Sequence, residues 1–237
     1  MILGIIQARI NSDRFPIKIF AKFSDGSVVL ERVIRQVLFS EILDKVVIAT
    51  NYISFSSISS FVKSNFDEIA VISGSDNDVL DRFVSCLSIF DNVDVVVRIT
   101  ADNPLTCPKY IDYAIKKHLE SKADLTHFLG IPLGTGVEVI NPNTLFKISQ
   151  LTYDPYDREH VTPFIYKNRD IFKVVEPMFE VGNFQNFRVT IDTENDLFFV
   201  DGLLRLLDYK LPVYVEDIIN VSSKVAEYSL VKSNLDL

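Results

Sequence analysis

The stretch Val93–Ile99, which reads Val-Asp-Val-Val-Val-Arg-Ile, decides the fold class of this chain. Its apolar residues occupy both odd and even positions, so a strand formed here would be buried on both faces. Strands of this kind are typical of parallel sheets that are covered by helices on both sides. We therefore expect an α/β protein whose other elements are arranged around this strand.

Segments of strand length and segments with helical spacing alternate through the first half of the chain. Three further apolar runs precede Val93–Ile99, at Ile2–Ile6, Lys45–Ala49 and Ile69–Ile72. The helical segments between them cover residues 29–38, 53–66 and 79–90. This alternation predicts an open, mostly parallel sheet with helices on both faces.

The second half of the chain has a less regular pattern. After Pro108 we expect one more helix and two strands, at Leu125–Leu129 and Val137–Ile140. Short mixed segments follow at 143–151, 159–167, 172–175 and 187–191, before a last amphipathic helix near Leu197–Leu207. We expect a single domain over residues 1–237. Its mixed C-terminal region either covers a site or forms a subunit interface.

Composition excludes several classes of protein. The chain has 237 residues, 48% of them hydrophobic, which is enough for one well-buried core. Lys and Arg number 24 against 32 Asp and Glu, a net charge of −8, which argues against binding to nucleic acid or to an anionic membrane. No signal peptide or membrane span is recognisable. Cys86 and Cys107 form no C-x-x-C motif, so a cytoplasmic location is expected.

Three polar loops follow predicted strands. In an open α/β sheet, ligands bind outside the carboxyl ends of the strands, at the point where the strand order reverses. The segments at that edge are residues 7–18, 98–105 and 189–193. Candidate functional residues are therefore sought in these three loops.

The first loop is a cationic island in an acidic chain. Arg9, Arg14, Lys18 and Lys22 surround a single acidic residue, Asp13. Guanidinium and ammonium groups at close range are what a di- or triphosphate requires. The alternative is that these long side chains only solvate a loop, and the residues alone favour neither interpretation. The loop is not a Walker A motif, because the G-x-x-x-x-G-K-[ST] spacing is absent.

Two aspartates follow strands in the other two loops. Asp102 and Asp192 would lie at one edge of the sheet, and two carboxylates there suit Mg²⁺, which takes one or two carboxylates together with phosphate and water. Each has a structural alternative. Asp102 can be a turn residue, and Asp192 or Thr193 can cap the last helix, with Thr193-x-x-Asp196 resembling a capping box.

The stretch Asp157-Arg158-Glu159-His160 is the other dense polar cluster. A single histidine of this kind is more often a hydrogen-bonded structural residue than a catalyst. His118 and His127 suggest no function, and no Ser/His/Asp or Cys/His nucleophile pattern is present.

Several motifs, in the same order along the chain, resemble those of a known family. They are Ile5–Arg9, Ser12-x-Arg14-x-Pro16-x-Lys18, Asp78-Val79-Leu80-x-Arg82, Arg98-Ile99-Thr100-Ala101-Asp102-x-Pro104-Leu105, Arg158–Pro163 and Thr190-Ile191-Asp192-Thr193-x-x-Asp196. This chain resembles the SpsF-type spore-coat polysaccharide biosynthesis proteins, which belong with the acidic-sugar cytidylyltransferases such as the CMP-KDO synthetases. The resemblance spans nearly the whole chain.

The resemblance implies a fold and an activity. The fold would be the Rossmann-like nucleotide-diphospho-sugar transferase fold. The activity would be Mg²⁺-dependent transfer of CMP from CTP to the hydroxyl of a sugar, expected to be acidic, for surface polysaccharide or glycoconjugate synthesis. The partners would be CTP, the sugar and a second copy of the chain, with residues 130–190 forming the dimer interface and the sugar site.

The resemblance also implies roles for individual residues. The nucleotide would be bound by Ala8, Arg9, Ser12, Arg14, Lys18, Asp78, Arg82 and Thr100. Catalysis would rest on Lys18, Arg14 and Asp102, and Mg²⁺ would be held by Asp102 and Asp192. The sugar would be bound by Arg158, Glu159 and His160.

This sequence departs from the family pattern in the phosphate loop. The family usually has Gly-Ser-Thr-Arg-Leu-Pro-Gly-Lys where this chain has residues 11–18, so Asn11 and Ile17 replace glycines and Asp13 adds an anion. A β-branched residue such as Ile17 disfavours positive φ. Gly134-Thr135-Gly136 also lacks a basic residue that the family often has there. Two alternatives therefore stay open: a catalytically degenerate homodimer that binds a nucleotide or sugar, and a glycosyltransferase that uses a nucleotide-sugar donor.

Overall fold

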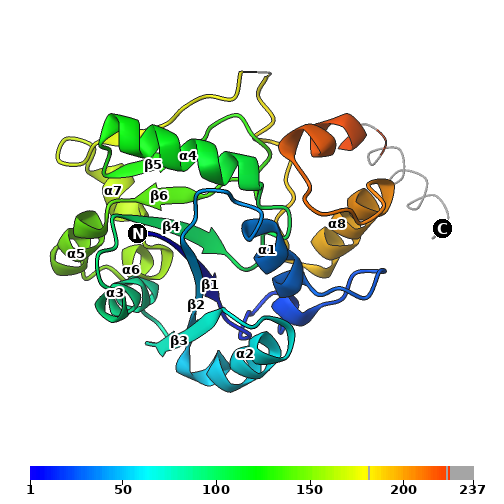
Figure 1. Cartoon of the computed structure of the whole chain (residues 1–237), viewed down its shortest axis with the longest axis horizontal. Helices are drawn as coiled ribbons and strands as arrows, with labels where there is room; N and C mark the ends of the chain where they lie inside the picture. Colours follow the sequence, from blue (N-terminus) through cyan, green and yellow to red (C-terminus); the bar gives the residue numbers. More distant parts are fainter. Residues whose placement is uncertain (181, 223, 225–237) are drawn as a thin grey trace.

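A central sheet of seven strands organises the computed structural model, which describes residues 1–180, 182–222 and 224 (Figure 1). The strand order is β3-β2-β1-β4-β6-β5-β7. The strands are β1 (Ile2–Ala8), β2 (Lys45–Asn51), β3 (Ala70–Gly74), β4 (Val95–Thr100), β5 (Leu125–His127), β6 (Glu138–Ile140) and β7 (Val174–Val175). Four neighbouring strands, β3, β2, β1 and β4, are parallel, whereas β6 is antiparallel to both β4 and β5. The mostly parallel sheet predicted from the sequence is confirmed.

Helices cover both faces of the sheet, as the doubly buried strands predict. On one face α1 (Val29–Val37), α2 (Tyr52–Asn65) and α4 (Pro108–Ser121) share a core with Ile6, Ile48 and Val97. On the other face a second core with Leu3, Ile5 and Val47 contains α3 (Val79–Ile89), α5 (Pro142–Leu151) and residues from the region of α6 (Pro155–His160) and α7 (Pro163–Lys167). Successive β1 residues thus enter opposite cores, which is the period-2 pattern of a strand.

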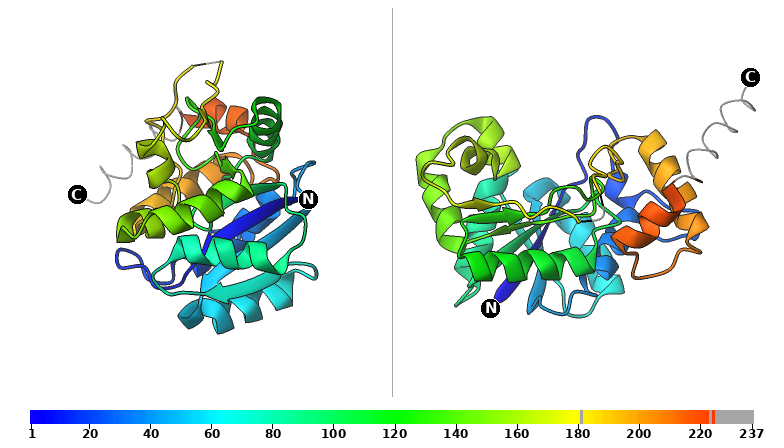
Figure 2. Two further views of the ribbon diagram at one scale, coloured as in Figure 1. Left: turned by 90° about the vertical axis from the view of Figure 1, so that its left-hand side faces the viewer. Right: turned by 90° about the horizontal axis from the view of Figure 1, so that it is seen from above.

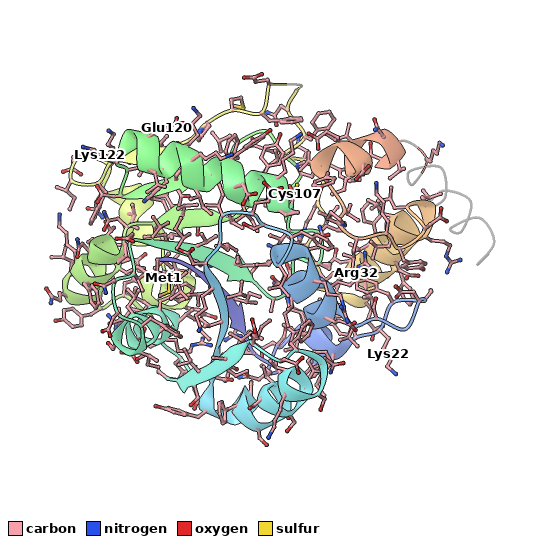
Figure 3. The ribbon with its side chains drawn as sticks, in the orientation of Figure 1. Met1, Lys22, Arg32, Cys107, Glu120 and Lys122 are labelled. Carbon is pink, nitrogen blue, oxygen red and sulfur yellow. The ribbon has the colours of Figure 1, made fainter. Side chains whose placement is uncertain are left out.

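A third cluster joins the C-terminal part of the chain to α1 and to residues on either side of the 3-10 helix η1 (Lys18–Phe20). Helix α8 (Glu194–Leu206) packs there with Val213 and Ile218, and lies at the opposite end of the molecule from α3 and α5 (Figures 1 and 2). Arg32 of α1, labelled in Figure 3, is buried and donates to the carbonyl oxygens of Tyr209 at 3.3 Å and Lys210 at 3.1 Å. A further helical stretch over residues 215–222 was not predicted.

Some expected elements differ from the structure. The predicted segment 159–167 is two short helices, α6 and α7, because the chain turns sharply at Val161. The expected segment 187–191 forms no strand of the sheet. It runs extended beside loops instead, where Val189 N donates to the Leu133 carbonyl and Ile191 N donates to the Asp102 carbonyl. No helix in the described residues is long and apolar enough to cross a membrane.

The sheet topology determines where a ligand can bind. The chain passes from β1 to β2 on one side and returns to β4 on the other side of β1, so the strand order reverses between β1 and β4. Gln7 and Thr100 are paired at the carboxyl ends of these two strands. The loops after β1 and β4 therefore open into one crevice.

Candidate active site

A cleft of about 440 Å³ lies at the carboxyl edge of β1 and β4. Eleven of the thirteen residues predicted to function line it: Ala8, Arg9, Ser12, Arg14, Lys18, Arg82, Thr100, Asp102, Glu159, His160 and Asp192. They come from the carboxyl ends of β1 and β4 and the loops after them, from η1, from α3 and α6, and from the segment before α8. The tertiary structure thus gathers residues that lie up to 184 positions apart in the sequence, from Ala8 to Asp192.

Lys18 is the centre of this cleft. Its Nζ donates to Asp102 Oδ2 at 2.7 Å, to Asp192 Oδ1 at 2.9 Å and to the Ile191 carbonyl oxygen at 2.8 Å. All three donor positions of the ammonium group are therefore used. Because Lys18 is buried, these bonds also explain how its charge is tolerated inside the protein.

The loop before Lys18 is closed by backbone hydrogen bonds. Ile17 N donates to the Ile10 carbonyl oxygen at 2.9 Å, and Ile10 N donates to Ser54 Oγ at 3.0 Å, which ties the loop to α2. Asn51 Nδ2 also donates to Asn11 Oδ1 at 3.1 Å. The loop is thereby held against the N-terminus of α2.

Ile17 has the backbone conformation that glycine favours. Its φ of 60° and ψ of 18° are left-handed, and its side chain is 56% exposed. For a residue other than glycine this conformation costs roughly 1–2 kcal/mol. The loop therefore keeps the backbone path expected of the glycine that the family has there, and the isoleucine side chain faces solvent.

Asp192 is surrounded by cations. It accepts from Lys18, from Arg14 Nη2 at 3.0 Å and from Arg188 Nη2. Partial burial raises the pKa of Asp192, but the Lys18 hydrogen bond and the charges of Lys18, Arg14 and Arg188 outweigh this, so its pKa lies below the ordinary value. The carboxylate is therefore ionised at neutral pH. The capping role considered for this region belongs to Thr193 and Asp196, which form a capping box at α8.

The two carboxylates that meet at Lys18 suit a magnesium ion bound together with a phosphate. No cluster of three or more His, Cys, Asp or Glu side chains with a metal-binding arrangement exists among the residues described. Mg²⁺ commonly takes only one or two protein carboxylates and completes its shell with phosphate oxygens and water. Asp102 and Asp192 meet that requirement.

Arg82 is the cleft cation without a partner. Only 3% of it is exposed, its Nε has no hydrogen-bond partner, and in the described part of the chain no hydrogen bond or ion pair reaches its guanidinium group. Burial lowers the pKa of Arg82, as does the positive charge of Arg9, and the opposing charges of Asp76 and Asp78 do not offset these effects. Gly74 makes room for it, since a Cβ there would lie 2.8 Å from Arg82 Cγ. A buried cation of this kind requires an acceptor from a ligand.

Glu159 and His160, at the end of α6, line the cleft directly before a strained turn at Val161. Glu159 Oε1 accepts from Arg9 Nη2 at 3.0 Å, and the His160 ring lies 4.4 Å from that of Tyr156. The next residue, Val161, is buried at φ 72° and ψ −55°, and Thr162 N donates to the His160 carbonyl oxygen at 2.9 Å. This is a γ-turn with positive φ, a conformation that costs about 1–3 kcal/mol.

Two predicted site residues lie outside the lining of the cleft. Arg158 Nε donates to Asp78, and Arg158 Nη1 donates to the carbonyl oxygens of Ser149 at 3.1 Å and Thr152 at 3.0 Å. Asp78 also caps α3, accepting from Asp81 N at 2.8 Å. These contacts tie α6 to the start of α3, so the structure gives both side chains a positioning role behind Glu159 and Arg82.

A second pocket of about 280 Å³ adjoins the cleft and shares Arg98 and Thr100 with it. Sequence reasoning missed its polar residues, His127, Glu138, Asn103 and Gln185. The sequence contained one indication of this pocket, namely a charged residue in each of the otherwise largely apolar strands β4 and β6. The strand pairing places these two residues, Arg98 and Glu138, opposite each other. His127 carries no recognisable motif and becomes significant only through its neighbours in the fold.

Comparison with known proteins bears on the fold and the family of this chain. A model of the cytidylyltransferase family matches residues 3–210. An uncharacterized protein of Methanocaldococcus jannaschii is 36% identical over 99% of this chain and 95% of its own length. The spore coat polysaccharide biosynthesis protein SpsF of Bacillus subtilis is 32% identical over 94% of each chain. The structure of a cytidylyltransferase from Leptospira borgpetersenii superposes with a TM-score of 0.86, at 27% identity, over 95% of each chain. The fold implied by the family resemblance is confirmed.

We expect Ile17→Gly to stabilise the protein. The substitution removes the left-handed strain of roughly 1–2 kcal/mol, and the flexibility of glycine returns about 0.5–1 kcal/mol of that gain. Chemical denaturation should show a net rise in the free energy of unfolding of about 0.5–1 kcal/mol. The control is Leu119→Gly, at an exposed position within α4, where glycine should lower stability by about 1 kcal/mol. A loss of stability in Ile17→Gly would contradict the strain.

The contribution of Asp192 to stability should depend on pH. Since its folded-state pKa is lowered, the stabilisation is present above the unfolded-state pKa of about 4 and is lost as pH falls through the folded-state pKa. The difference in unfolding free energy between the parent protein and Asp192→Asn should be largest near pH 6 and shrink below pH 4. In a Lys18→Met background the same comparison should give a weaker pH dependence. An equal dependence in both backgrounds would exclude Lys18 as a cause.

Proposed function

The chain belongs to the cytidylyltransferase family and is a nucleotidyltransferase, and we propose that it transfers CMP from CTP to a sugar hydroxyl, with release of pyrophosphate. The observation that carries this proposal is the position of Lys18 between Asp102 and Asp192 at the switch point of the sheet. The cleft around it contains ion pairs between cationic side chains and carboxylates. These groups match the two parts of a magnesium–triphosphate complex, because carboxylates bind the metal ion and cations bind the phosphates.

When that complex binds, the ion pairs within the cleft would be replaced by ion pairs between the protein and the substrate. Asp102 and Asp192 would turn from Lys18 to Mg²⁺, and Lys18 and Arg14 would turn to the phosphate oxygens. Each buried charge keeps a partner of opposite sign in both states, which limits the cost of desolvation. Arg82 would gain an acceptor that it lacks in the free protein.

The chemical step needs positioning and charge stabilisation more than covalent catalysis. The sugar oxygen forms a bond to the α-phosphorus of CTP, its proton passes to solvent, and the bond from that phosphorus to the bridging oxygen breaks. Lys18 and Arg14 offset the negative charge that develops on the leaving pyrophosphate. Bound Mg²⁺ supplies Lewis-acid polarisation of the phosphate oxygens.

Two observations favour an active enzyme over a degenerate binding protein. Ile17 adopts the left-handed backbone that glycine favours and turns its side chain to solvent, so this side chain does not line the cleft. Asp13 lines the cleft, but it is exposed and forms no ion pair within the described residues, so the cleft cations are not paired with it. A glycosyltransferase would be distinguished by hydrolysis of a nucleotide-sugar donor in preference to CTP.

The proposal extends to the biological role, the oligomeric state and the cellular location of the protein. The similarity to a spore coat polysaccharide biosynthesis protein supports a role in surface polysaccharide synthesis. A homodimer through residues 130–190 is supported by the exposed large apolar side chains there, namely Leu133, Phe146, Leu151, Tyr153, Tyr156, Ile171 and Met178. Both cysteines are free and buried, as suits a reducing cytoplasm where CTP is available.

CTP with Mg²⁺ should stabilise the protein against heat. At about 100 times its dissociation constant a ligand adds roughly 2.7 kcal/mol, which for a chain of this length raises Tm by roughly 5–10 °C. Lys18→Met and Asp102→Asn should lose the shift and also lose pyrophosphate release. The matched control is Lys22→Met, because Lys22 is exposed at the edge of the molecule and outside the cleft (Figure 3). A shift that survives both cleft variants would refute the proposed site.

Arg82→Met should change nucleotide affinity and stability in opposite directions. Removal of a buried cation without a partner should raise the unfolding free energy of the free protein by about 1 kcal/mol. Loss of a charged donor to the nucleotide should weaken CTP binding by at least tenfold, at about 1.5–3 kcal/mol for such a hydrogen bond. Calorimetric titration and chemical denaturation measure the two effects separately. Unchanged CTP affinity would show that Arg82 does not contact the nucleotide.

A further inference from the structure

Gln7 lines the cleft at the end of β1 and takes no part in the hydrogen bonds of Lys18. It is paired with Thr100 of β4 across the switch point of the sheet. Side chains alternate along a strand, so Gln7 projects to the same face as Ile5, which packs in the core that contains α3. Arg82 of α3 also lines the cleft. The cleft therefore extends from Lys18 to Gln7 and Arg82 beside α3.

The side-chain amide of Gln7 has a fixed orientation. Its Oε1 accepts from Arg98 Nε at 3.0 Å. Because a guanidinium group can only donate, the oxygen of the amide must face Arg98 and the NH₂ group must face away from it. Gln7 is only partly buried, and no hydrogen bond from its Nε2 is found among the described residues. The NH₂ group is therefore available to a ligand in the cleft.

Arg98 is itself anchored by Glu138. Arg98 Nη1 donates to Glu138 Oε2 at 2.6 Å, across the antiparallel pair β4–β6. The Tyr166 hydroxyl donates to Glu138 Oε1 at 2.9 Å, and Thr162 Oγ1 lies 3.0 and 3.1 Å from the two carboxylate oxygens. Burial raises the pKa of Tyr166, as do the charge of Glu138 and the hydrogen bond to it, so this donor stays protonated. The chain of hydrogen bonds from Tyr166 to Gln7 keeps the amide from turning over.

Arg82 is a second free donor on this side of the cleft. It is buried, and its guanidinium group has no hydrogen bond or ion pair in the part of the chain that the structure describes. Three carboxylates on this side already accept from guanidinium groups, namely Glu159 from Arg9, Glu138 from Arg98 and Asp78 from Arg158. Gln7 and Arg82 thus offer donors where the nearby carboxylates are engaged. A ligand group that presents acceptors is complementary to this side.

The base of the nucleotide is the part of the substrate that fits this description. With Mg²⁺ and the triphosphate at Lys18, the side of the cleft beside α3 is left for the nucleoside. Cytosine has two adjacent acceptors, O2 and N3, whereas uracil has an N–H at position 3 between its two oxygens. An amide N–H that faces position 3 pairs with cytosine and opposes uracil. A site built for one hydrogen-bonding pattern strongly rejects an analogue that leaves its polar groups unpaired.

We propose that Gln7 selects cytosine over uracil by donating from Nε2 to N3 of the base, and that Arg98 and Glu138 are positioning residues that hold its amide in this orientation. The inference rests on the proposed transfer from CTP and adds the group that chooses the base. A glutamine whose amide is free to turn can offer its NH₂ group to cytosine or its oxygen to uracil. Arg98 holds the oxygen, and this removes the second possibility.

The test measures the ratio of CTP affinity to UTP affinity. Each nucleotide is titrated with Mg²⁺ into the full-length protein by calorimetry, without a sugar. The unmodified protein should bind CTP at least about tenfold more tightly than UTP. Gln7→Met removes the amide and should reduce this ratio about fivefold or more. Gln7→Glu is nearly isosteric and replaces the NH₂ group by an acceptor, so its ratio should fall below that of Gln7→Met.

Arg98 variants test the positioning role. In Arg98→Met the amide of Gln7 can turn its oxygen to the base, so the ratio should fall close to that of Gln7→Met. Arg98→Lys keeps a charged donor beside Gln7 and Glu138, and its ratio should stay above that of Arg98→Met. A ratio in Arg98→Met equal to that of the unmodified protein would exclude Arg98 as a positioning residue.

Arg14→Met is the matched control, because Arg14 lines the same cleft and its proposed partner is a phosphate, which both nucleotides have. It should weaken CTP and UTP by the same factor and leave the ratio within twofold. Equal affinities in the unmodified protein, a ratio unmoved in both Gln7 variants, or an equal fall of the ratio in Arg14→Met would overturn the inference. Failure of the proposed function is seen separately, because the unmodified protein would then bind neither nucleotide, which overturns both.

Discussion

The ammonium group of Lys18 is the interaction around which this site is organised. It joins two aspartates from loops 90 residues apart, Asp102 and Asp192, together with a backbone carbonyl from the segment before α8. Without it, Asp102 would lose its ion-pair partner among the described residues, and only Arg14 and Arg188 would remain to neutralise Asp192. The same geometry allows an exchange of partners, in which the carboxylates turn to a metal and the lysine to phosphate, so the resting ion pairs prepare the site for its substrate.

The two adjoining pockets differ in how their charged side chains are paired. In the cleft that we assign to the nucleotide, pairs of cations and carboxylates from separate loops can separate when a charged substrate enters, and the part of the chain that the structure describes gives Arg82 no hydrogen-bond partner before that. In the second pocket, Arg98 and Glu138 face each other from neighbouring strands, so the sheet maintains their pair. Pairs between loops can exchange partners more readily than pairs held by a strand register, which is why we assign the phosphates of the substrate to the first pocket.

Strained backbone occurs on both sides of the cleft. Ile17 is left-handed just before Lys18, and Val161 forms a γ-turn just after His160. In both cases the surrounding structure fixes the conformation: the bond from Ile17 N to Ile10 closes the loop, and Val161 is buried in the core. Side chains beside such residues are held in position by the backbone, as an active site requires.

The sequence by itself determined the sheet class and the three loops at its carboxyl edge, because strand periodicity and loop composition act over a few residues. The capping box at Thr193 was readable for the same reason. The resemblance of its motifs to a known family added most of the residues that line the cleft. Only the tertiary structure decided that Asp78 and Arg158 pair with each other, that Arg82 finds no hydrogen-bond partner among the described residues, and that Tyr166 joins His127 to Glu138. These facts depend on which distant segments lie side by side, and charge pairing and tautomer state are properties of neighbours in space rather than in sequence.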